Sequence, residues 1–194
     1  MAPLRETEIK LPVRDRKTLA RRLKALGFRR SDPRHLEVNL FLDFPDLRLR
    51  RARCLLRLRF EGKQCLLTFK GPRTESRRYK TRAELETRVE SGERLKEILE
   101  SLGLRETFRY EKYRTSFAPP RALAGASGAV VEFDETPVGN FLELEGPPRW
   151  IDRVAAKLGC SSRDYVTVGY PTLYFERCRK LGKKPGNMVF NTQK

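Results

Sequence analysis

Three stretches of the chain repeat an apolar residue every three to four positions, which is the spacing along one face of an α-helix. They are residues 15–28, 91–103 and 147–159. A glycine stands at or next to the end of each stretch, as it often does after the last turn of a helix. Because only one side of each predicted helix is apolar, each helix must cover an apolar surface that other elements provide.

Most of the remaining chain alternates apolar and polar residues, which is the pattern of strands whose two faces meet different surroundings. The alternating stretches are residues 5–13, 35–44, 77–87, 108–117, 129–136 and 140–146, together with a hairpin over residues 55–71. They amount to about eight strands, and most follow one another at hairpin distance. An antiparallel barrel with amphipathic helices packed outside accounts for both patterns, so we expect an α+β fold that is mainly β.

The polar positions of these strands are charged on one face in strand after strand. At the N-terminus Glu6, Glu8 and Lys10 share a face, opposite Thr7 and Ile9. The later strands place charges on a shared face at Arg57, Arg59, Lys70, Lys80, Arg82, Glu84, Glu86, Lys112, Arg114, Glu132, Asp134, Glu143 and Glu145.

A sheet with one charged face has two interpretations. In the first, an open antiparallel sheet turns its charged face to solvent and its apolar face to the helices. In the second, the sheet closes into a barrel with the charges inside, and about eight strands enclose enough space for one small ligand. Enclosing so many charges is costly unless they are paired or are neutralised by a ligand and a metal ion.

Composition adds a strong positive charge to this picture. The chain has 194 residues and a formal net charge of +17, from 42 Lys and Arg against 25 Asp and Glu. Such a charge indicates an anionic partner: a nucleic acid, an acidic membrane surface or a phosphorylated small molecule. No run of about 18 apolar residues occurs, so we expect no membrane-spanning helix and no membrane partner.

Cysteine and histidine carry little chemistry in this sequence. The four cysteines have no CxxC or zinc-ligand spacing, so we expect reduced thiols in a cytoplasmic protein. The N-terminal residues show no apolar segment of a secretory signal. The single histidine, His35, has no nucleophile motif beside it, which argues against Ser-His-Asp and Cys-His mechanisms.

The closed-barrel interpretation makes a chemical prediction. Inward Arg and Lys would bind the oxygens of a polyanion, and inward Asp and Glu would bind a hard divalent cation. A metal ion held between carboxylates and phosphate oxygens is a phosphoryl-transfer site. Such a site works by positioning and charge neutralisation, so it requires no Ser, Cys or His nucleophile.

The pentapeptide ETEIK, residues 6–10, resembles the ExExK signature of the CYTH superfamily, the triphosphate tunnel metalloenzymes. Further stretches resemble strands of that family in the same order: LRLR, LTFKGP, KTRAELE, EKYRTSF and VVEFDETPVGNFLELEG. The resemblance covers roughly residues 4–180. It implies a closed eight-stranded antiparallel barrel whose tunnel holds a triphosphate, within a single CYTH-like domain over residues 1–181. Residues 182–194 are expected to form a poorly ordered basic tail.

The resemblance also implies roles for most of the charged positions. The implied ligands of Mg²⁺ or Mn²⁺ are Glu6, Glu8, Asp134, Glu143 and Glu145. The implied triphosphate-binding residues are Lys10, Arg57, Arg59, Lys70, Lys80, Arg82, Lys112 and Arg114. Lys10, which the family places near the reactive end of the substrate, is an implied catalytic residue together with Glu6 and Glu8. Glu84 and Glu86 lie on the same tunnel strand as Lys80 and Arg82, and ion pairing that only holds the barrel is the alternative role for all four.

Members of this superfamily are divided between two reactions. Triphosphatases direct water at the terminal phosphorus of inorganic, thiamine or nucleoside triphosphate, whereas class IV adenylyl cyclases convert ATP to cyclic AMP and pyrophosphate. The cyclases resemble one another in a His-Phe pair shortly before ExExK, and this chain has MAPLR there. That difference favours hydrolysis, with the cyclase as the alternative. Inorganic triphosphate is the simplest substrate, because Trp150 begins a predicted helix and offers no evident platform for thiamine.

Two further hypotheses come from the rest of the chain. The charge of +17 also suggests a nucleic-acid-binding module. Against it, acids share the strands with the bases, so we expect no specific nucleic acid as partner. The segment that follows residue 164 contains Pro171 at a predicted helix start, and we expect this segment to close one mouth of the tunnel.

Overall fold

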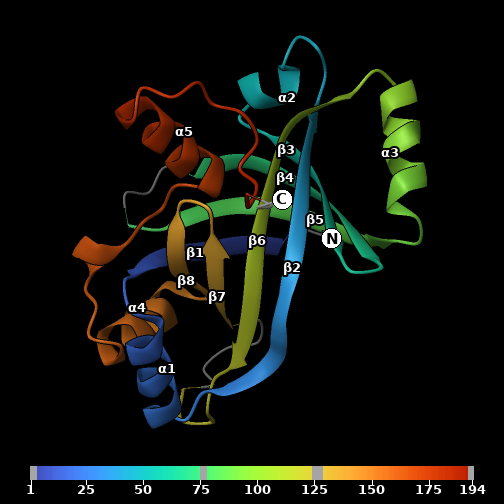
Figure 1. Ribbon diagram of the computed structural model, residues 1–194. Helices are drawn as coiled ribbons and strands as arrows, with labels where there is room; N and C mark the ends of the chain where they lie inside the picture. Colours follow the sequence, from blue (N-terminus) through green and yellow to red (C-terminus); the bar gives the residue numbers. More distant parts are fainter. Residues whose placement is uncertain (1–3, 75–77, 124–128, 192–194) are drawn as a thin grey trace.

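Eight strands form one closed barrel in the computed structural model, which describes residues 4–74, 78–123 and 129–191 (Figure 1). The strands are β1 (Leu4–Val13), β2 (Arg29–Asp43), β3 (Leu55–Glu61), β4 (Gln64–Thr74), β5 (Lys80–Val89), β6 (Arg105–Ala118), β7 (Val130–Thr136) and β8 (Gly139–Glu145). Around the barrel they follow the order β1, β5, β4, β3, β2, β6, β7, β8, and each neighbouring pair is antiparallel. The predicted closed barrel is confirmed, and the open sheet is excluded.

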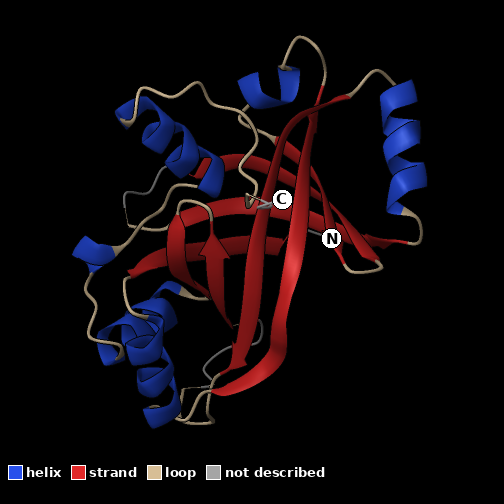
Figure 2. Cartoon of the chain, in the orientation of Figure 1, coloured by secondary structure: helices blue, strands red, loops and turns tan. Residues whose placement is uncertain are grey.

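The helices lie outside the barrel, as Figure 2 shows. They are α1 (Arg16–Ala25), α2 (Arg48–Arg51), α3 (Gly92–Ser101), α4 (Pro148–Lys157) and α5 (Tyr170–Lys180), with a 3₁₀ turn over Ser162–Asp164. Helices α1, α3 and α4 confirm the three predicted from apolar spacing, and α5 begins beside Pro171 as expected. Within the described ranges, no helix has the length and hydropathy needed to cross a membrane.

The outer faces of β1, β7 and β8 are apolar and are covered by α1 and α4. Ile9 of β1 and Leu144 of β8 are fully buried there, in one cluster with Leu23 of α1 and Val154 of α4. Because successive residues of a strand point to opposite faces, the residues that alternate with these point into the barrel. The apolar packing outside therefore sets which charges lie inside.

Two smaller apolar clusters cover the rest of the barrel wall. Leu58 of β3 is fully buried, and Leu95 and Leu99 of α3 pack against its cluster. Phe108 of β6 lies beneath α5, where its ring centroid is 5.3 Å from that of Phe175. The stripes of α1 and α4 thus meet the outside of the barrel, and α3 does so through Leu95 and Leu99, whereas Ile98 and Leu102 stay exposed.

Strand β2 is longer than the sequence indicates, because it begins at Arg29 rather than at residue 35. Its pairing with β6 shifts register on both sides of Asp32. Such bulges break the alternation of apolar and polar residues, so the period of two is not visible there. The predicted start of β5, residue 77, lies outside the described residues, and β5 is described from Lys80.

The C-terminal segment differs from the expected loose tail over residues 182–194. Met188 is fully buried, and its backbone carbonyl accepts a hydrogen bond of 2.9 Å from the N–H of Glu111 in β6. In return, the N–H of Met188 donates to the carbonyl of Arg109 at 2.9 Å. This part of the segment is packed because one apolar side chain and a short backbone pairing hold it to the barrel. Residues 192–194 lie outside the described residues.

Candidate functional site

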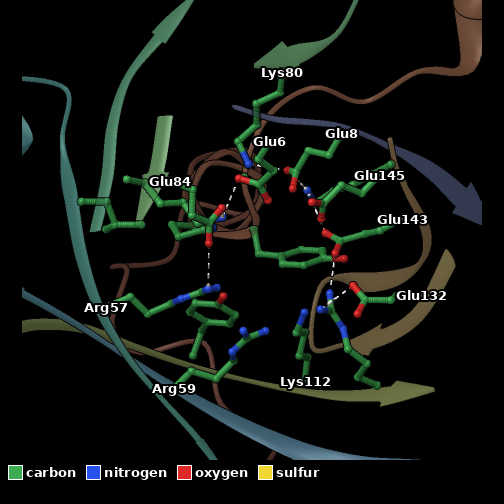
Figure 3. Close-up of a pocket in the computed structure, with 18 of the residues that line it drawn as sticks. Glu6, Glu8, Arg57, Arg59, Lys80, Glu84, Lys112, Glu132, Glu143 and Glu145 are labelled. Atoms are coloured by element: carbon green, nitrogen blue, oxygen red, sulfur yellow. Dashed lines mark hydrogen bonds and ion pairs between the residues drawn. The ribbon is translucent and has the colours of Figure 1, made fainter. Parts of the chain in front are cut away.

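The barrel encloses a cavity of about 390 Å³, and all eight strands contribute residues to its wall. Figure 3 shows charged side chains of this wall, with Glu6, Glu8 and Glu145 gathered near one another. The predicted site residues in this wall are Glu6, Glu8, Lys10, Arg57, Arg59, Lys70, Lys80, Glu84, Glu86, Lys112, Arg114, Glu143 and Glu145. Two predicted site residues, Arg82 and Asp134, do not line it. Most of the charged residues that the sequence places on one strand face therefore line the cavity.

Most of the charged side chains of the wall are withdrawn from bulk solvent, although Glu86 is exposed. Lys10 and Lys112 are each 2% exposed, and Arg114 is 6% exposed. Isolated charges would be very costly in such surroundings, and the wall avoids this cost by placing acids beside bases. The cavity is therefore a network of ion pairs in which a highly charged ligand would have to exchange partners.

Glu6 and Glu8 of β1 and Glu145 of β8 form the acidic centre of the cavity. Oxygen atoms of these three carboxylates all lie within 4.8 Å of one another. Burial and the charge of Glu8 raise the pKa of Glu6 to about 9, and the same two causes raise the pKa of Glu145 to about 7. Carboxylates this close repel one another unless a proton or a cation lies between them. Several carboxylate oxygens at short range are the ligands of hard divalent cations, so this donor set fits such an ion.

Glu8 is held in its ionised form by two lysines. Lys10 Nζ donates a hydrogen bond of 2.8 Å to Glu8, and Lys80 forms a close ion pair with the same carboxylate oxygen. Burial acts to raise the pKa of Glu8, but the charges of Lys10 and Lys80 outweigh it and hold this pKa well below its ordinary value. Burial is also the main reason why the pKa of Lys80 is lowered to about 8.

Glu143 of β8 lies next to this centre but is occupied by cations. Lys10 Nζ is 2.9 Å from Glu143, and Arg114 forms a close ion pair with it. Although burial opposes ionisation, these cations hold the pKa of Glu143 below its ordinary value, with Lys10 contributing most. Glu143 thus links the acidic centre to the basic side of the cavity.

Glu84 and Glu86 of β5 pair with basic side chains of the neighbouring strands. Lys70 Nζ lies 2.7 Å from Glu84 and 2.7 Å from Glu6. Arg59 lies 3.0 Å and Arg57 3.5 Å from Glu86. These glutamates therefore pair with the residues that are expected to bind phosphate.

Asp134, which the sequence predicts to be a metal ligand, does not lie with the carboxylates of the acidic centre. Its side chain is fully buried outside the cavity wall, where Arg114 donates to both carboxylate oxygens at 2.7 Å. Lys112 donates to the same carboxylate at 3.0 Å and the hydroxyl of Tyr170 donates to it at 2.7 Å. Asp134 lies directly opposite Arg114 in the pairing of β7 with β6, which explains why it meets this arginine and not the carboxylates of β1. Instead of joining the acidic centre, it anchors the basic side.

Arg82 also differs from its expected place in the cavity wall. Its guanidinium Nε and Nη2 donate to the backbone carbonyl of Gly71 at 3.1 and 2.9 Å. The register of β4 against β5 shifts between Lys70 and Arg73, and this irregularity brings the carbonyl of Gly71 to the arginine. Arg82 therefore supports the β4 backbone at one edge of the barrel.

Four residues that sequence reasoning left out belong to the site or its support. Glu132, on the same strand face as Asp134, lines the cavity and lies 2.5 Å from Arg114. Glu37 is fully buried and lies 3.2 Å from Lys112. Asn39 of the same strand is also fully buried, and the fourth residue is Tyr170. The alternation within residues 35–44 could have identified Glu37 and Asn39, whereas nothing local in the sequence indicates Tyr170.

The first turn of α5 forms one wall of the cavity. Gly169, Tyr170 and Pro171 all line it. The ring of Tyr170 faces two cations, with its centroid 5.0 Å from Lys10 Nζ and 5.6 Å from Lys112 Nζ. Since Tyr170 also hydrogen-bonds to a buried carboxylate of the barrel, α5 is tied to the charged network by a polar contact as well as by apolar packing.

Comparisons with known proteins agree with this architecture. A search against protein families matches residues 4–168 to the CYTH domain. A Methanocaldococcus jannaschii protein named "putative adenylate cyclase" is 30% identical over 140 residues, which are 72% of this chain and 75% of that protein.

Solved structures with low sequence identity share the fold. A "putative adenylate cyclase" of Vibrio parahaemolyticus matches with a TM-score of 0.73 at 18% identity, over 87% of this chain and 96% of that one. A Hippeastrum protein, described as a "putative adenylyl cyclase" with a dominant triphosphatase activity, has a TM-score of 0.58 at 18% identity, over 93% of this chain and 97% of that one. Because the family match covers most of the chain and the barrel is the same, the chain belongs to the CYTH domain family.

Proposed function

We propose that the protein hydrolyses a triphosphate substrate inside the barrel, in a reaction that depends on Mg²⁺ or Mn²⁺. The observation that carries this proposal is the pairing of two unlike groups in one enclosed cavity. A cluster of three carboxylates lies in contact with buried lysines, and arginines complete the charged wall. A chain of phosphates bridged to a divalent cation satisfies both groups at once.

The acidic centre would hold the metal ion. Glu6, Glu8 and Glu145 have oxygens close enough to share one cation, and Glu143 lies beside them. A divalent ion bound there would neutralise phosphate charge that builds up during the reaction. Binding of the ion would also offset the repulsion among these carboxylates, which helps to raise the pKa of Glu6 and the pKa of Glu145.

The basic residues would bind the phosphate oxygens. Lys10, Lys112 and Arg114 line the cavity, and they now pair with Glu143 or with Asp134. Arg57 and Arg59 hold comparable positions on the opposite wall through Glu86. The phosphate oxygens would take over some of these donors from the carboxylates, and the surrounding ion pairs would hold the cations in place when charge develops on the phosphates.

Water is the proposed nucleophile. The transition state of phosphoryl transfer is loose, with little covalent bonding to the transferred group. Alignment of the water molecule and neutralisation of the phosphate oxygens would therefore supply most of the rate enhancement. Lys10 lies between Glu8 and Glu143, beside the acidic centre, and in this proposal it binds the terminal phosphate. This agrees with the absence of histidine from the residues that line the described cavity.

The second candidate is conversion of ATP to cyclic AMP and pyrophosphate, which the names of two relatives favour. It would use the same phosphate and metal sites with the ribose 3′-hydroxyl as nucleophile. The sequence MAPLR before ETEIK lacks the His-Phe pair on which the cyclase resemblance rests. The Hippeastrum relative, whose triphosphatase activity is described as dominant, agrees with hydrolysis as the first choice.

The test is a metal-dependence assay with matched variants. The purified protein is offered inorganic triphosphate, thiamine triphosphate and ATP, each with Mg²⁺, Mn²⁺ or EDTA. We expect orthophosphate release that EDTA abolishes and that falls at least about 100-fold in Glu6→Gln and Glu8→Gln, which remove one metal-binding charge each. Glu97→Gln, on the exposed face of α3, is the control and should retain full activity. Equal activity in EDTA, or in the cavity variants, would rule the proposal out.

A further inference from the structure

A second group of potential metal ligands lies on the opposite side of the barrel from the acidic centre. His35 and Glu37 of β2 and Glu61 of β3 each offer one ligand atom, and these atoms all lie within 4.8 Å of one another. In the barrel order, β3 is three strands away from β1 and β2 is three strands away from β8. Arg59 and Lys112, which neighbour the new group, lie across the cavity from the acidic centre in Figure 3. The two groups of ligands are therefore separate.

The pairing of β2 with β3 explains why these three residues meet. Glu37 lies directly opposite Glu61 in the register, and His35 lies two residues before Glu37 on the same strand face. Glu37 is fully buried, whereas the side chains of His35 and Glu61 are 27% and 25% exposed. An ion could thus enter from the rim of the barrel and be held from inside by Glu37.

Glu37 is a buried carboxylate whose hydrogen-bonding capacity is unused. Neither of its oxygens accepts a hydrogen bond from the part of the chain that the structure describes. Its nearest cations are Lys112 at 3.2 Å, Arg114 at 3.5 Å and Arg59 at 3.7 Å. A buried carboxylate without hydrogen bonds is costly, so such a group calls for a further partner.

The neighbouring cations do not fill this role, because each of them has an acid closer than Glu37. Asp134 accepts from Lys112 at 3.0 Å and from Arg114 at 2.7 Å. Glu86 accepts from Arg59 at 3.0 Å. These bases are therefore neutralised by other acids, and the charge of Glu37 is available to an added cation.

His35 can present a nitrogen lone pair to the same group. Its Nδ1 lies 3.0 Å from the carbonyl oxygen of Pro33 and 3.2 Å from a carboxylate oxygen of Asp32. Both neighbours only accept hydrogen bonds, so Nδ1 carries the proton of the neutral imidazole and Nε2 keeps the lone pair. Nε2 lies 3.8 Å from the carboxylate of Glu37. A carbonyl that holds the other ring nitrogen is the usual support of a metal-binding histidine.

We propose that His35, Glu37 and Glu61 bind a divalent transition-metal ion, with Zn²⁺ preferred over Mg²⁺. Imidazole nitrogen is a common ligand of Zn²⁺, whereas Mg²⁺ selects oxygen ligands. The ion would replace the proton that joins His35 to Glu37 in the metal-free protein, and it would tie the rim of β2 to that of β3. The site does not depend on the reaction proposed for the cavity, because none of its three ligands lines that cavity.

His35 gives a specific readout because it is the only histidine in the chain. The full-length ¹⁵N-labelled protein is kept near neutral pH in excess Mg²⁺, which occupies oxygen-only sites, and Zn²⁺ is added stepwise. We expect one equivalent of Zn²⁺ to shift the Nε2 resonance of His35 while Nδ1 stays protonated, and Mg²⁺ alone to leave both resonances unchanged. At about 100 times its Kd, Zn²⁺ should also raise Tm by about 5–10 °C.

Variants separate this site from the acidic centre. Glu61→Gln, at the partly exposed rim, and His35→Asn should each weaken Zn²⁺ binding at least about tenfold in a calorimetric titration in excess Mg²⁺. Glu106→Gln, an exposed carboxylate of β6, is the control and should bind Zn²⁺ like the parent. Glu6→Gln should leave the shift of the His35 resonance intact.

Three results would overturn the site. They are a His35 resonance that Zn²⁺ does not move, a shift that persists at the same Zn²⁺ concentration in Glu61→Gln, and a shift that Glu6→Gln abolishes. The first would show that Zn²⁺ does not bind the imidazole, and the second that His35 binds the ion without the carboxylate of Glu61. The third would assign the ion to the acidic centre.

Discussion

At the scale of single residues, the two carboxylates Asp134 and Glu145 show how position decides the role of the same chemical group. Glu145 lies with two other carboxylates, and burial together with the charge of Glu8 raises its pKa. Asp134 is surrounded by donors from Arg114, Lys112 and Tyr170. The first arrangement attracts a cation, and the second holds cations that would themselves bind phosphate.

Substitution of these two carboxylates should therefore affect the stability of the protein differently. Asp134→Asn leaves buried cations without their counter-charge and should lower the free energy of unfolding by about 3–5 kcal/mol. Glu145→Gln removes a repelling charge and should leave the metal-free protein as stable as the parent or more so, while weakening Mn²⁺ binding. Urea unfolding and a Mn²⁺ titration measure the two effects. Weaker Mn²⁺ binding in a folded Asp134→Asn variant, with unchanged binding in Glu145→Gln, would reverse these assignments.

Tyr170 can be tested through its hydroxyl alone. Tyr170→Phe keeps the ring beside Lys10 and removes the 2.7 Å hydrogen bond to Asp134. We expect a loss of about 0.5–1.5 kcal/mol in unfolding free energy and a rise in KM with little change in kcat, because the anchor of the phosphate-binding side is loosened. Tyr174→Phe, one turn further along α5, is the matched control. A lower kcat at constant KM would indicate that the hydroxyl takes part in the chemical step.

The lone histidine gives a dependence of stability on pH. Its interaction with Glu37, whose carboxylate lies 3.8 Å from His35 Nε2, is the largest cause that raises the pKa of His35 to about 9, with burial opposing. Because the folded-state pKa is above the ordinary value of about 6.5, the contribution to stability is complete below pH 6.5 and is lost as the pH rises through 9. The difference in Tm between the parent and His35→Asn should shrink between about pH 6 and pH 10. A difference that grows over this range would contradict the assignment.

The sequence predicted the inward residues well because alternation is a local property of a strand. Glu6, Glu8 and Lys10 line the cavity as their spacing requires. It could not separate Asp134 from Glu145, because both are acids on inward faces and only the pairing of β7 with β6 sets Asp134 against Arg114. Tyr170 was out of reach for the same reason, since its partners come from strands distant in the chain.

At the scale of elements, the regular strands and long helices followed from their periods, and the irregular pieces did not. The bulges beside Asp32 hide the first residues of β2, and α2 is shorter than two helical turns. Residues 182–191 contain several charged and polar residues, and the burial of Met188 depends on a groove that only the folded barrel supplies. Each of these pieces is held by tertiary contacts, so local preference could not reveal it.

Helix α5 provides a prediction at this scale. All eight strands precede residue 164, so a chain ending at residue 163 retains every strand pairing of the barrel. It loses the cavity wall formed by Gly169, Tyr170 and Pro171 and the bond that orients the basic side. We expect this truncated chain to remain folded by circular dichroism and to lose most triphosphatase activity. A folded truncation with full activity would show that α5 does not complete the cavity.

At the scale of the whole molecule, the excess of positive charge is carried by residues outside the cavity. The lining of the cavity contains equal numbers of acidic and basic residues, so the excess of Lys and Arg is carried by the exterior. Such an exterior raises the local concentration of small polyanions and speeds their approach. In the proposed function, the net charge would serve capture of the substrate, whereas the balanced interior would serve binding and chemistry.

This division predicts how salt affects the reaction. Long-range attraction is screened over about 3–10 Å as ionic strength rises toward 1 M, while pairs inside the barrel are screened much less. We expect kcat/KM for a triphosphate to fall steeply between about 0.05 and 0.5 M KCl with kcat nearly constant. A proportional fall in kcat would place the salt sensitivity in the cavity itself.

The most direct test of the account is a product-resolved assay in ¹⁸O-labelled water, with Mg²⁺ and either inorganic triphosphate or ATP. Attack of water on the terminal phosphorus places one labelled oxygen in the released orthophosphate and leaves ADP or pyrophosphate unlabelled. We predict this pattern for both substrates, its loss in EDTA, and its loss in the Glu6→Gln and Glu8→Gln variants. Formation of cyclic AMP and unlabelled pyrophosphate from ATP, or no turnover of either compound, would contradict the proposed hydrolysis.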